Sequence, residues 1–234
     1  MRTVKAAVCR TFGAPLTIED IELAAPGPNQ VEVTLAACAI CYSDISMIDG
    51  GWGGHLPAVY GHEASGHITG VGPGVAGFAE GDAVLVTLIR ACGTCPACVT
   101  AHPATCVNPG PRDNGILRSG EEIVEQGLHC GAFAEKVVVD LSQIAKIPAD
   151  MPMDAASLLS CGVITGVGAV VNTADVRPGQ NVVVIGHVHQ RRDRAGVKAD
   201  VVQGAVRAKL DHRAHRLQAH TRAARIVKPR IVLG

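Results

Sequence analysis

Aromatic residues are scarce in this chain of 234 residues: phenylalanine, tyrosine and tryptophan together make up 3%. A core must therefore be built mostly from valine, alanine, leucine and isoleucine, and a hydrophobic content of 47% makes a sizeable one feasible. No apolar run reaches the roughly 18 residues that a membrane helix needs. The first residues also lack the apolar stretch and cleavage site of a secretory signal. We therefore expect no membrane association and a cytoplasmic location.

We do not expect disulfides in this chain. The nine cysteines are odd in number and irregularly spaced, and no secretory signal accompanies them. Cysteines that stay reduced are available as metal ligands, and their pattern favours that role.

A net charge of zero conceals an abrupt change of sign along the chain. Residues 1–186 hold 9 Lys+Arg and 18 Asp+Glu, whereas residues 187–234 hold 12 Lys+Arg and 3 Asp. The last segment also has no cysteine and no aromatic residue. The shift predicts a boundary near residue 186. A basic tail could bind nucleic acid, but it has no interleaved aromatics and no recognised motif, so we expect no nucleic-acid partner.

Four cysteines lie within fifteen residues, at Cys92, Cys95, Cys98 and Cys106. Zinc accepts four thiolates in a tetrahedral site without redox chemistry. A loop this short has no core of its own, so bound metal would stabilise its fold directly. Reduced surface thiols or two local disulfides are the alternatives. The spacing favours a structural zinc lobe over residues 90–110.

Residues 1–90 read as short strands separated by glycine and proline turns. This spacing predicts a barrel-like β body rather than alternating strands and helices. Residues 112–128 are polar and contain glycine, which predicts an excursion on the surface. The segments that we expect to be strands are 3–8, 16–23, 31–37, 83–88 and 132–139, and those that we expect to be helices are a short one beginning near 41, 154–159 and a tightly packed one at 162–173. Residues 181–186 read as a buried parallel strand.

Three separated residues are further candidates for zinc ligands: Cys41, His62 and Cys161. A thiolate and an imidazole both suit zinc. Spacing alone supports them weakly, because a histidine after a glycine is usually a turn residue and a buried cysteine usually packs as a small apolar group.

Together these motifs resemble the zinc-dependent alcohol dehydrogenases of the medium-chain dehydrogenase/reductase family. The resemblance covers about residues 1–186, and it is nearest to the glutathione-dependent formaldehyde and broad alcohol dehydrogenase branch. The matching residues, in the family's order, are Cys41, Ser43 and Asp44; Gly61, His62, Glu63 and Gly66; Gly81, Asp82 and Val84; the four lobe cysteines; and Cys161, Gly162, Thr165 and Gly166.

The resemblance implies a mostly β, α+β fold. We expect a GroES-like, partly open β-barrel catalytic domain at 1–160, and a linker helix with the first strand of a Rossmann domain at 161–186. An atypical basic tail, helical or disordered, would follow at 187–234. Residues 200–210 and 212–226 are the candidate helices of that tail.

The resemblance also implies a catalytic zinc on Cys41, His62 and Cys161, with a water or alcohol oxygen as fourth ligand, and so two zinc ions per chain. Glu63 would lie next to this zinc, Asp44 would orient His62, and Ser43 would pass the alcohol proton toward solvent. The implied reaction oxidises an alcohol to an aldehyde or ketone by hydride transfer to NAD. Alternatively, Ser43 is a helix cap and Glu63 a surface charge.

The pattern departs from the family where NAD should bind. The family's first cofactor strand leads into Gly-x-Gly-x-x-Gly, but here only Gly186 remains and His189 stands where backbone must approach phosphate. Thr165 and Gly186 are the remaining candidates for cofactor contact, and we expect weak or absent NAD binding. The second interpretation is an inactive zinc-binding remnant, truncated or frameshifted after Gly186. An apolar face at 163–171 would then be an aggregation liability or the interface of a homo-oligomer.

Overall fold

The computed structural model describes residues 1–177, 180–185, 205–210 and 217–219. The chain divides into two compact units, Met1–Gly166 and Val167–Gly234. The first unit carries nearly all of the motifs identified in the sequence, and it is described first.

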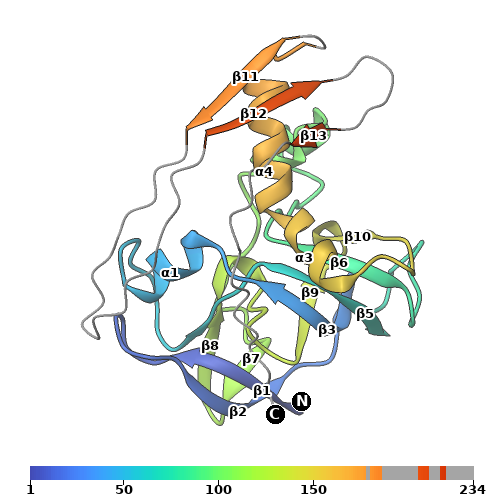
Figure 1. Ribbon diagram of the computed structural model, residues 1–234. Helices are drawn as coiled ribbons and strands as arrows, with labels where there is room; N and C mark the ends of the chain where they lie inside the picture. The colour runs from blue at the N-terminus through green and yellow to red at the C-terminus, as the bar shows by residue number, and fades with distance from the viewer. Residues whose placement is uncertain (178–179, 186–204, 211–216, 220–234) are drawn as a thin grey trace. The chain divides into compact units, whose positions relative to one another are not determined.

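A closed five-stranded barrel forms one half of the first unit (Figure 1). Its strands, in the order of pairing, are β1 (Arg2–Cys9), β2 (Thr17–Leu23), β7 (Leu117–Ser119), β8 (Glu122–Gln126) and β4 (Ala58–Val59). The ring closes because β4 pairs with both β8 and β1. It is therefore more completely closed than the partly open barrel that we predicted.

A second sheet of five strands forms the other half. In spatial order they are β10 (Ile144–Lys146), β6 (Ala83–Thr87), β5 (Glu63–Val71), β3 (Gln30–Ala39) and β9 (Lys136–Asp140). The central β3 and β5 pair antiparallel with Ala39 opposite Glu63, and this register shifts at two irregularities. Gly66 on β5 is needed there, because a Cβ would lie 2.1 Å from the carbonyl oxygen of Thr34.

Valine, isoleucine and leucine fill both cores, as the shortage of aromatics predicts. One cluster fills the barrel and includes Val4, Ile21 and Leu117, and another lies under the second sheet and includes Val33 and Ile68. Alternating burial along β1 fits a strand with one face on the core.

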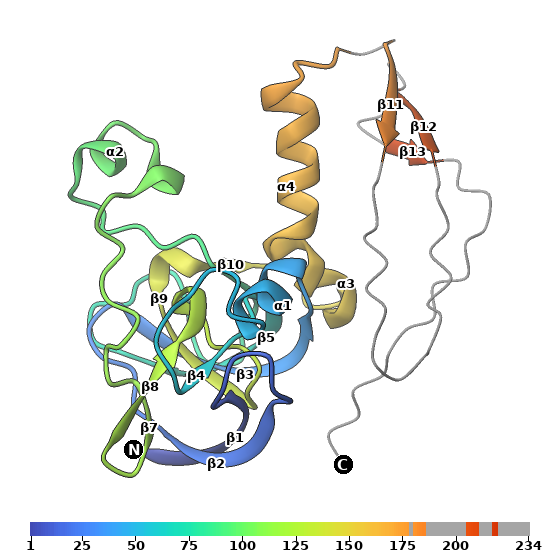
Figure 2. The same cartoon turned by 90° about the vertical axis from the view of Figure 1, so that its left-hand side faces the viewer.

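Short helices and turns join the strands. The helices are α1 (Tyr42–Ile48), α2 (Pro96–Val99), α3 (Met153–Ser157) and α4 (Gly162–Gly168), and the 3-10 turns are η1 (Pro103–Thr105), η2 (Gly127–His129), η3 (Leu141–Gln143) and η4 (Leu158–Ser160). The segment with α2 and η1 projects from the β body, as Figure 2 shows. The predicted helix at 162–173 is present as α4 followed by a π-helical turn, η5 (Ala169–Thr173). Its apolar side chains are exposed rather than tightly packed, with Val167 54% and Val171 55% accessible.

The predicted surface excursion at 112–128 is wrong. This segment supplies β7 and β8 to the barrel, and Leu117 and Val124 are each 1% exposed. A two-residue turn joins the strands, with Gly120 at φ 64° between the paired Ser119 and Glu122. A hairpin this short contains few apolar residues, so the polar composition of residues 112–128 did not indicate strands.

The second unit contains an antiparallel sheet in the order β11 (Asn181–Ile185), β12 (Ala205–Leu210) and β13 (Leu217–Ala219). Two predictions fail here. The described part of 181–186 is a strand, but it pairs antiparallel with β12 rather than parallel. Residues 205–210 and 217–219 are strands rather than helices, and Val206–Leu210 alternates apolar and basic residues with the period of a strand. Gly186 and the rest of the tail lie outside the described residues.

None of the helices in the described residues alone has the length and apolar composition to cross a bilayer. The bent pair Met153–Ser160 and Gly162–Thr173 meets those two criteria when both segments are counted together.

Glu32 provides a pH-dependent link between three strands and the N-terminus. Its side chain is fully buried, and Oε1 accepts hydrogen bonds from Arg2 (3.0 Å), Lys136 (3.0 Å) and Thr69 (2.7 Å). Burial favours the neutral acid, but the hydrogen bonds from Thr69 and Lys136 and the nearby positive charges outweigh it, so the pKa of Glu32 is lowered.

We expect Glu32→Gln to lower the free energy of unfolding at pH 7 by about 1 to 3 kcal/mol, because it removes charged hydrogen bonds. A lowered pKa means that the stabilisation is complete above about 4.5 and is lost as pH falls through the folded-state pKa. The difference between wild type and variant should therefore shrink below pH 4.5. Urea unfolding at pH 7, 5 and 3.5 measures it, and a difference that does not change with pH would contradict this assignment.

Candidate metal centres

The four lobe cysteines converge on one point. The sulfur atoms of Cys92, Cys95, Cys98 and Cys106 all lie within 4.8 Å of one another. Three of the separations are 3.9 Å (Cys92–Cys98), 3.5 Å (Cys95–Cys98) and 3.9 Å (Cys95–Cys106). Four Zn–S bonds of about 2.3 Å in a tetrahedron separate the sulfurs by about 3.8 Å, whereas a disulfide needs about 2.05 Å. All four are free thiols arranged as a structural zinc site, which confirms the predicted lobe.

Backbone N–H groups of the lobe point at the sulfur atoms. Cys106 Sγ accepts from the amides of Cys92 (3.3 Å) and Asn108 (3.4 Å), and Cys92 Sγ accepts from the amide of Cys95 (3.3 Å). Hydrogen bonds from the backbone and hydroxyl of Thr94 are the main cause of lowering the pKa of Cys92 to about 6. Burial and the neighbouring Cys95 raise the pKa of Cys98 to about 11. Full deprotonation of the set therefore requires a cation at its centre.

A second cluster gathers residues that are far apart in the sequence: Cys41, His62, Glu63 and Cys161. One ligand atom from each lies within 4.8 Å of the others. Cys41 is the N-cap of α1, just after β3, and His62 and Glu63 stand at the start of β5. The register of Ala39 opposite Glu63 brings these two ends together. Cys161 arrives between η4 and α4.

Asp44 fixes the geometry around His62. Its fully buried carboxylate accepts from His62 Nδ1 (2.9 Å) and from the amide of Gly61 (3.0 Å) through Oδ1, and from the amide of Cys41 (2.9 Å) through Oδ2. With Nδ1–H donated to Asp44, Nε2 of His62 keeps the lone pair that a metal needs. Burial alone would lower the pKa of His62, but Asp44 outweighs burial and the pKa is raised.

Gly61 makes the approach to this cluster possible. It has φ 91°, and a Cβ would lie 2.7 Å from the amide nitrogen of Phe133. Only glycine combines that backbone conformation with that closeness.

Burial and neighbouring groups oppose ionisation of Cys161 in the second cluster. Burial, followed by the nearby Cys41 and Glu63, raises the pKa of Cys161 to about 11. Glu63 is 4% exposed, so its carboxylate is not a surface charge. Thiols and a carboxylate this close repel one another when ionised, and a divalent cation relieves that repulsion. The donor set of two sulfurs, one imidazole and one carboxylate suits zinc.

The remaining predicted site residues are less closely involved. Ser43 is partly buried in the first turn of α1. Thr165 lies one turn after Cys161 in α4, with its hydroxyl 3.9 Å from the sulfur. Gly186 lies outside the described residues. The family resemblance implied that Glu63 lies next to the catalytic zinc, and the β3–β5 register shows that its carboxylate is near enough to be a fourth donor.

Known proteins share these features. The sequence profile described as "Alcohol dehydrogenase GroES-like domain" matches residues 27–149. Alcohol dehydrogenase B from Mycobacterium tuberculosis is 34% identical over 87% of this chain and 55% of its own length. Alcohol dehydrogenase-like 1 from Arabidopsis thaliana is 33% identical over 79% of this chain, which is about the share that residues 1–186 represent. The chain spans about half the length of the curated relatives that it matches.

Solved structures agree with the sequence matches. Benzyl alcohol dehydrogenase from Acinetobacter calcoaceticus superposes with a TM-score of 0.69 at 30% identity, covering 76% of this chain and 50% of that one. Acetophenone reductase from Geotrichum candidum, solved in complex with NAD, shares the fold with a TM-score of 0.62 at 23% identity, covering 76% and 49%. With its GroES-like domain, four-cysteine lobe and second donor cluster, this chain belongs to the zinc-type medium-chain alcohol dehydrogenase family.

Proposed function

We propose that the chain supplies the zinc-binding, alcohol-binding part of a zinc-dependent alcohol dehydrogenase. The observation that carries this proposal is the convergence of Cys41, His62, Glu63 and Cys161 from three separate parts of the fold. In this role Cys41, His62 and Cys161 hold a zinc ion, and Glu63 lies at the position that a substrate oxygen would share. When bound there, zinc acts as a Lewis acid that favours loss of the alcohol's proton. The reaction class is oxidation of an alcohol to an aldehyde or ketone with NAD as acceptor.

The chain's own residues would perform three tasks. Asp44 holds the imidazole of His62 in one tautomer through the bond to Nδ1. Glu63 places a carboxylate beside the metal position and so favours a divalent cation there. Ser43, in the adjacent helix, would accept the alcohol's proton and pass it toward solvent. The nine free cysteines support the reducing cytoplasm as the compartment.

A second candidate function is zinc binding without turnover. It is favoured by the antiparallel pairing of β11 with β12. A dinucleotide is normally held where a parallel strand leads into a helix whose N-terminus faces the pyrophosphate. An antiparallel pair does not create that position, so the acceptor would not be oriented.

Two measurements on the full chain separate these candidates. Both candidate functions predict two zinc ions per chain, measured by elemental analysis after dialysis. Cys161→Ser should reduce that number to one. Cys38→Ser is the matched control, because Cys38 belongs to neither cluster and should leave two ions bound.

Titration of NADH fluorescence then distinguishes the candidates. Micromolar binding together with turnover of a small alcohol would support the dehydrogenase. Two zinc ions with neither NADH binding nor turnover would support the zinc-binding protein. Fewer than one zinc per chain would contradict both.

A further inference from the structure

A cavity lies between the zinc lobe and the β body. Of the eight residues that make up the two metal clusters, only Cys106 lines it. Its volume is about 280 Å³. The described residues that line it come from the end of β6, from the lobe and from the turn after β8, namely Leu88, Ile89, Arg90, Ala104, Cys106, Pro109, Arg112, Leu128 and His129. They include two arginines and a histidine but no aspartate or glutamate.

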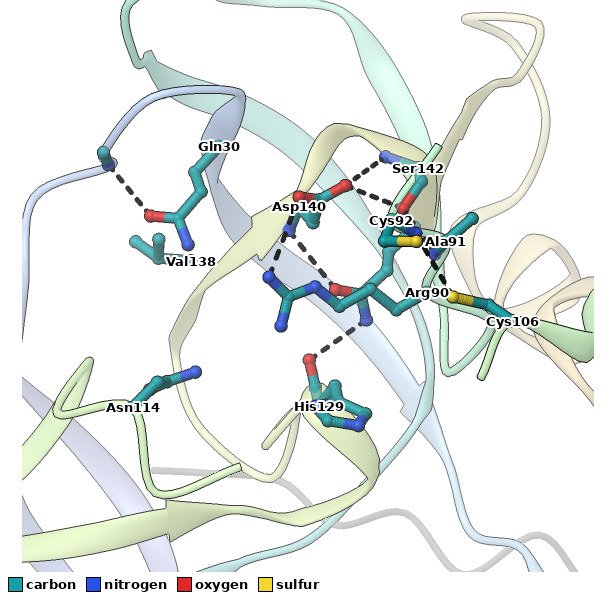
Figure 3. A network of polar contacts seen from close by, with 12 residues as sticks. Gln30, Arg90, Ala91, Cys92, Cys106, Asn114, His129, Val138, Asp140 and Ser142 are labelled. Atoms are coloured by element: carbon teal, nitrogen blue, oxygen red, sulfur yellow. Dashed lines mark hydrogen bonds and ion pairs between the residues drawn. The ribbon is translucent and has the colours of Figure 1, made fainter. Parts of the chain in front are cut away.

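Both guanidinium groups have donors to spare. Arg112 pairs with Glu125 at 3.2 Å, and Arg90 meets Asp140 only at 3.9 Å. A guanidinium carries five N–H donors, so one ion pair each leaves most of them available to a ligand. Figure 3 shows Arg90 between Asp140 and His129.

His129 contributes a polar atom with no partner. Its Nδ1 is buried and makes no hydrogen bond among the described residues. Burial, followed by the charges of Arg90 and Arg112, lowers the pKa of His129. Burying an unpaired imidazole nitrogen costs about 1 to 3 kcal/mol. Nδ1 itself is inaccessible to solvent, so the ring would have to turn toward the cavity for this atom to reach a ligand.

Two residues that line the cavity have a backbone conformation that is uncommon outside glycine. Leu128 and His129 both have positive φ, 49° and 58°, although neither is glycine. Left-handed non-glycine residues cost about 1 to 3 kcal/mol each and are concentrated at ligand sites. Gln143 holds this turn in place, since its Nε2 donates to the carbonyls of His129 (3.0 Å) and Thr87 (3.1 Å).

We propose that this cavity is a binding site for a small oxyanion, a carboxylate or phosphate group, held by Arg90 and Arg112 with the His129 ring beside them. The planar guanidinium of arginine can donate two parallel hydrogen bonds to two oxygens of a carboxylate or phosphate group. Bound here, the anion would contact both the lobe and the β body. Anion binding at this site does not require alcohol turnover. Failure of the anion test would therefore leave the proposed function unaffected, and failure of the proposed function would leave this site unaffected.

The test uses the full, zinc-loaded chain with sodium phosphate and sodium acetate as separate probes, each compared with sodium chloride at equal ionic strength. Calorimetric titration should detect binding of at least one oxyanion, and the one that binds identifies the chemistry. Arg90→Gln should weaken it at least tenfold, because a charged hydrogen bond is lost. Arg118→Gln removes the same charge from β7 outside the cavity and should leave the affinity unchanged.

Nuclear magnetic resonance of the histidine rings gives a second measurement. Anion binding is followed on the wild-type chain, and a variant serves only to assign the signal. The bound oxyanion should shift the His129 signal, assigned by its absence in His129→Gln, and should raise the pKa of that ring. Equal effects of chloride and both oxyanions would overturn the proposal. So would equal weakening by Arg118→Gln, or a His129 signal that does not respond while another histidine does.

Discussion

Asp44→Ala is expected to destabilise the first unit by about 3 to 5 kcal/mol and to remove one of two zinc ions. The carboxylate is fully buried and accepts three hydrogen bonds, from His62, Gly61 and Cys41. Deleting it leaves those donors unpaired in the core, which is among the largest costs of a single substitution. It also frees the imidazole to rotate and change tautomer, so the second cluster loses its fixed ligand.

Chemical denaturation and elemental analysis on the same samples measure both effects. The control is Asp20→Ala, since Asp20 is 60% exposed and pairs with the exposed Lys5, a contact worth less than about 1 kcal/mol. If Asp44→Ala retains two zinc ions and near-wild-type stability, then Asp44 does not organise the second cluster.

Cys98→Ser is expected to empty the lobe of zinc and unfold it locally. Cys98 is within 3.9 Å of both Cys92 and Cys95, and the lobe contains no residue of the apolar core clusters. Structural zinc contributes about 10 to 16 kcal/mol in small zinc-finger peptides, so three ligands cannot hold the fold with comparable strength. The β body has its own cores and should remain folded.

Limited proteolysis shows where this loss occurs. Cys98→Ser should become cleavable between residues 92 and 110 while circular dichroism of the strands stays near wild type. Val99→Ala is the control within the lobe, because Val99 is 67% exposed and is not one of the four ligands. Cleavage spread equally over the barrel would show instead that the lobe supports the whole unit.

The lobe was predictable because its information is local. Cys92, Cys95, Cys98 and Cys106 lie close enough in sequence for spacing alone to define a tetrahedral site. The second cluster was not predictable in that way. Cys41 and His62 meet through a strand register, and Cys161 arrives after the whole β body has been completed. Only resemblance to a family carried information over those distances.

Two failures of prediction have physical causes of their own. The hairpin of β7 and β8 carries charged residues such as Arg118 and Glu122, and its buried apolar residues are too few to mark it as a strand pair. Residues 205–210 contain apolar residues that fit a helical face as well as a strand, because a short segment satisfies both periods. The anion cavity had no signal at all, since Arg90, Arg112 and His129 meet only in the folded chain.

Closure of the barrel affects how the first unit meets other copies of itself. Closure of the ring gives each of its five strands a neighbour on both sides, which shortens the rows of unpaired amides and carbonyls that could template intermolecular sheet growth. One edge of the second sheet is β10, which is three residues long and carries Lys146 in an ion pair with Asp82, and the other edge is β9. A strand as short and charged as β10 gives a neighbouring chain little to extend, so sheet growth from that edge is disfavoured.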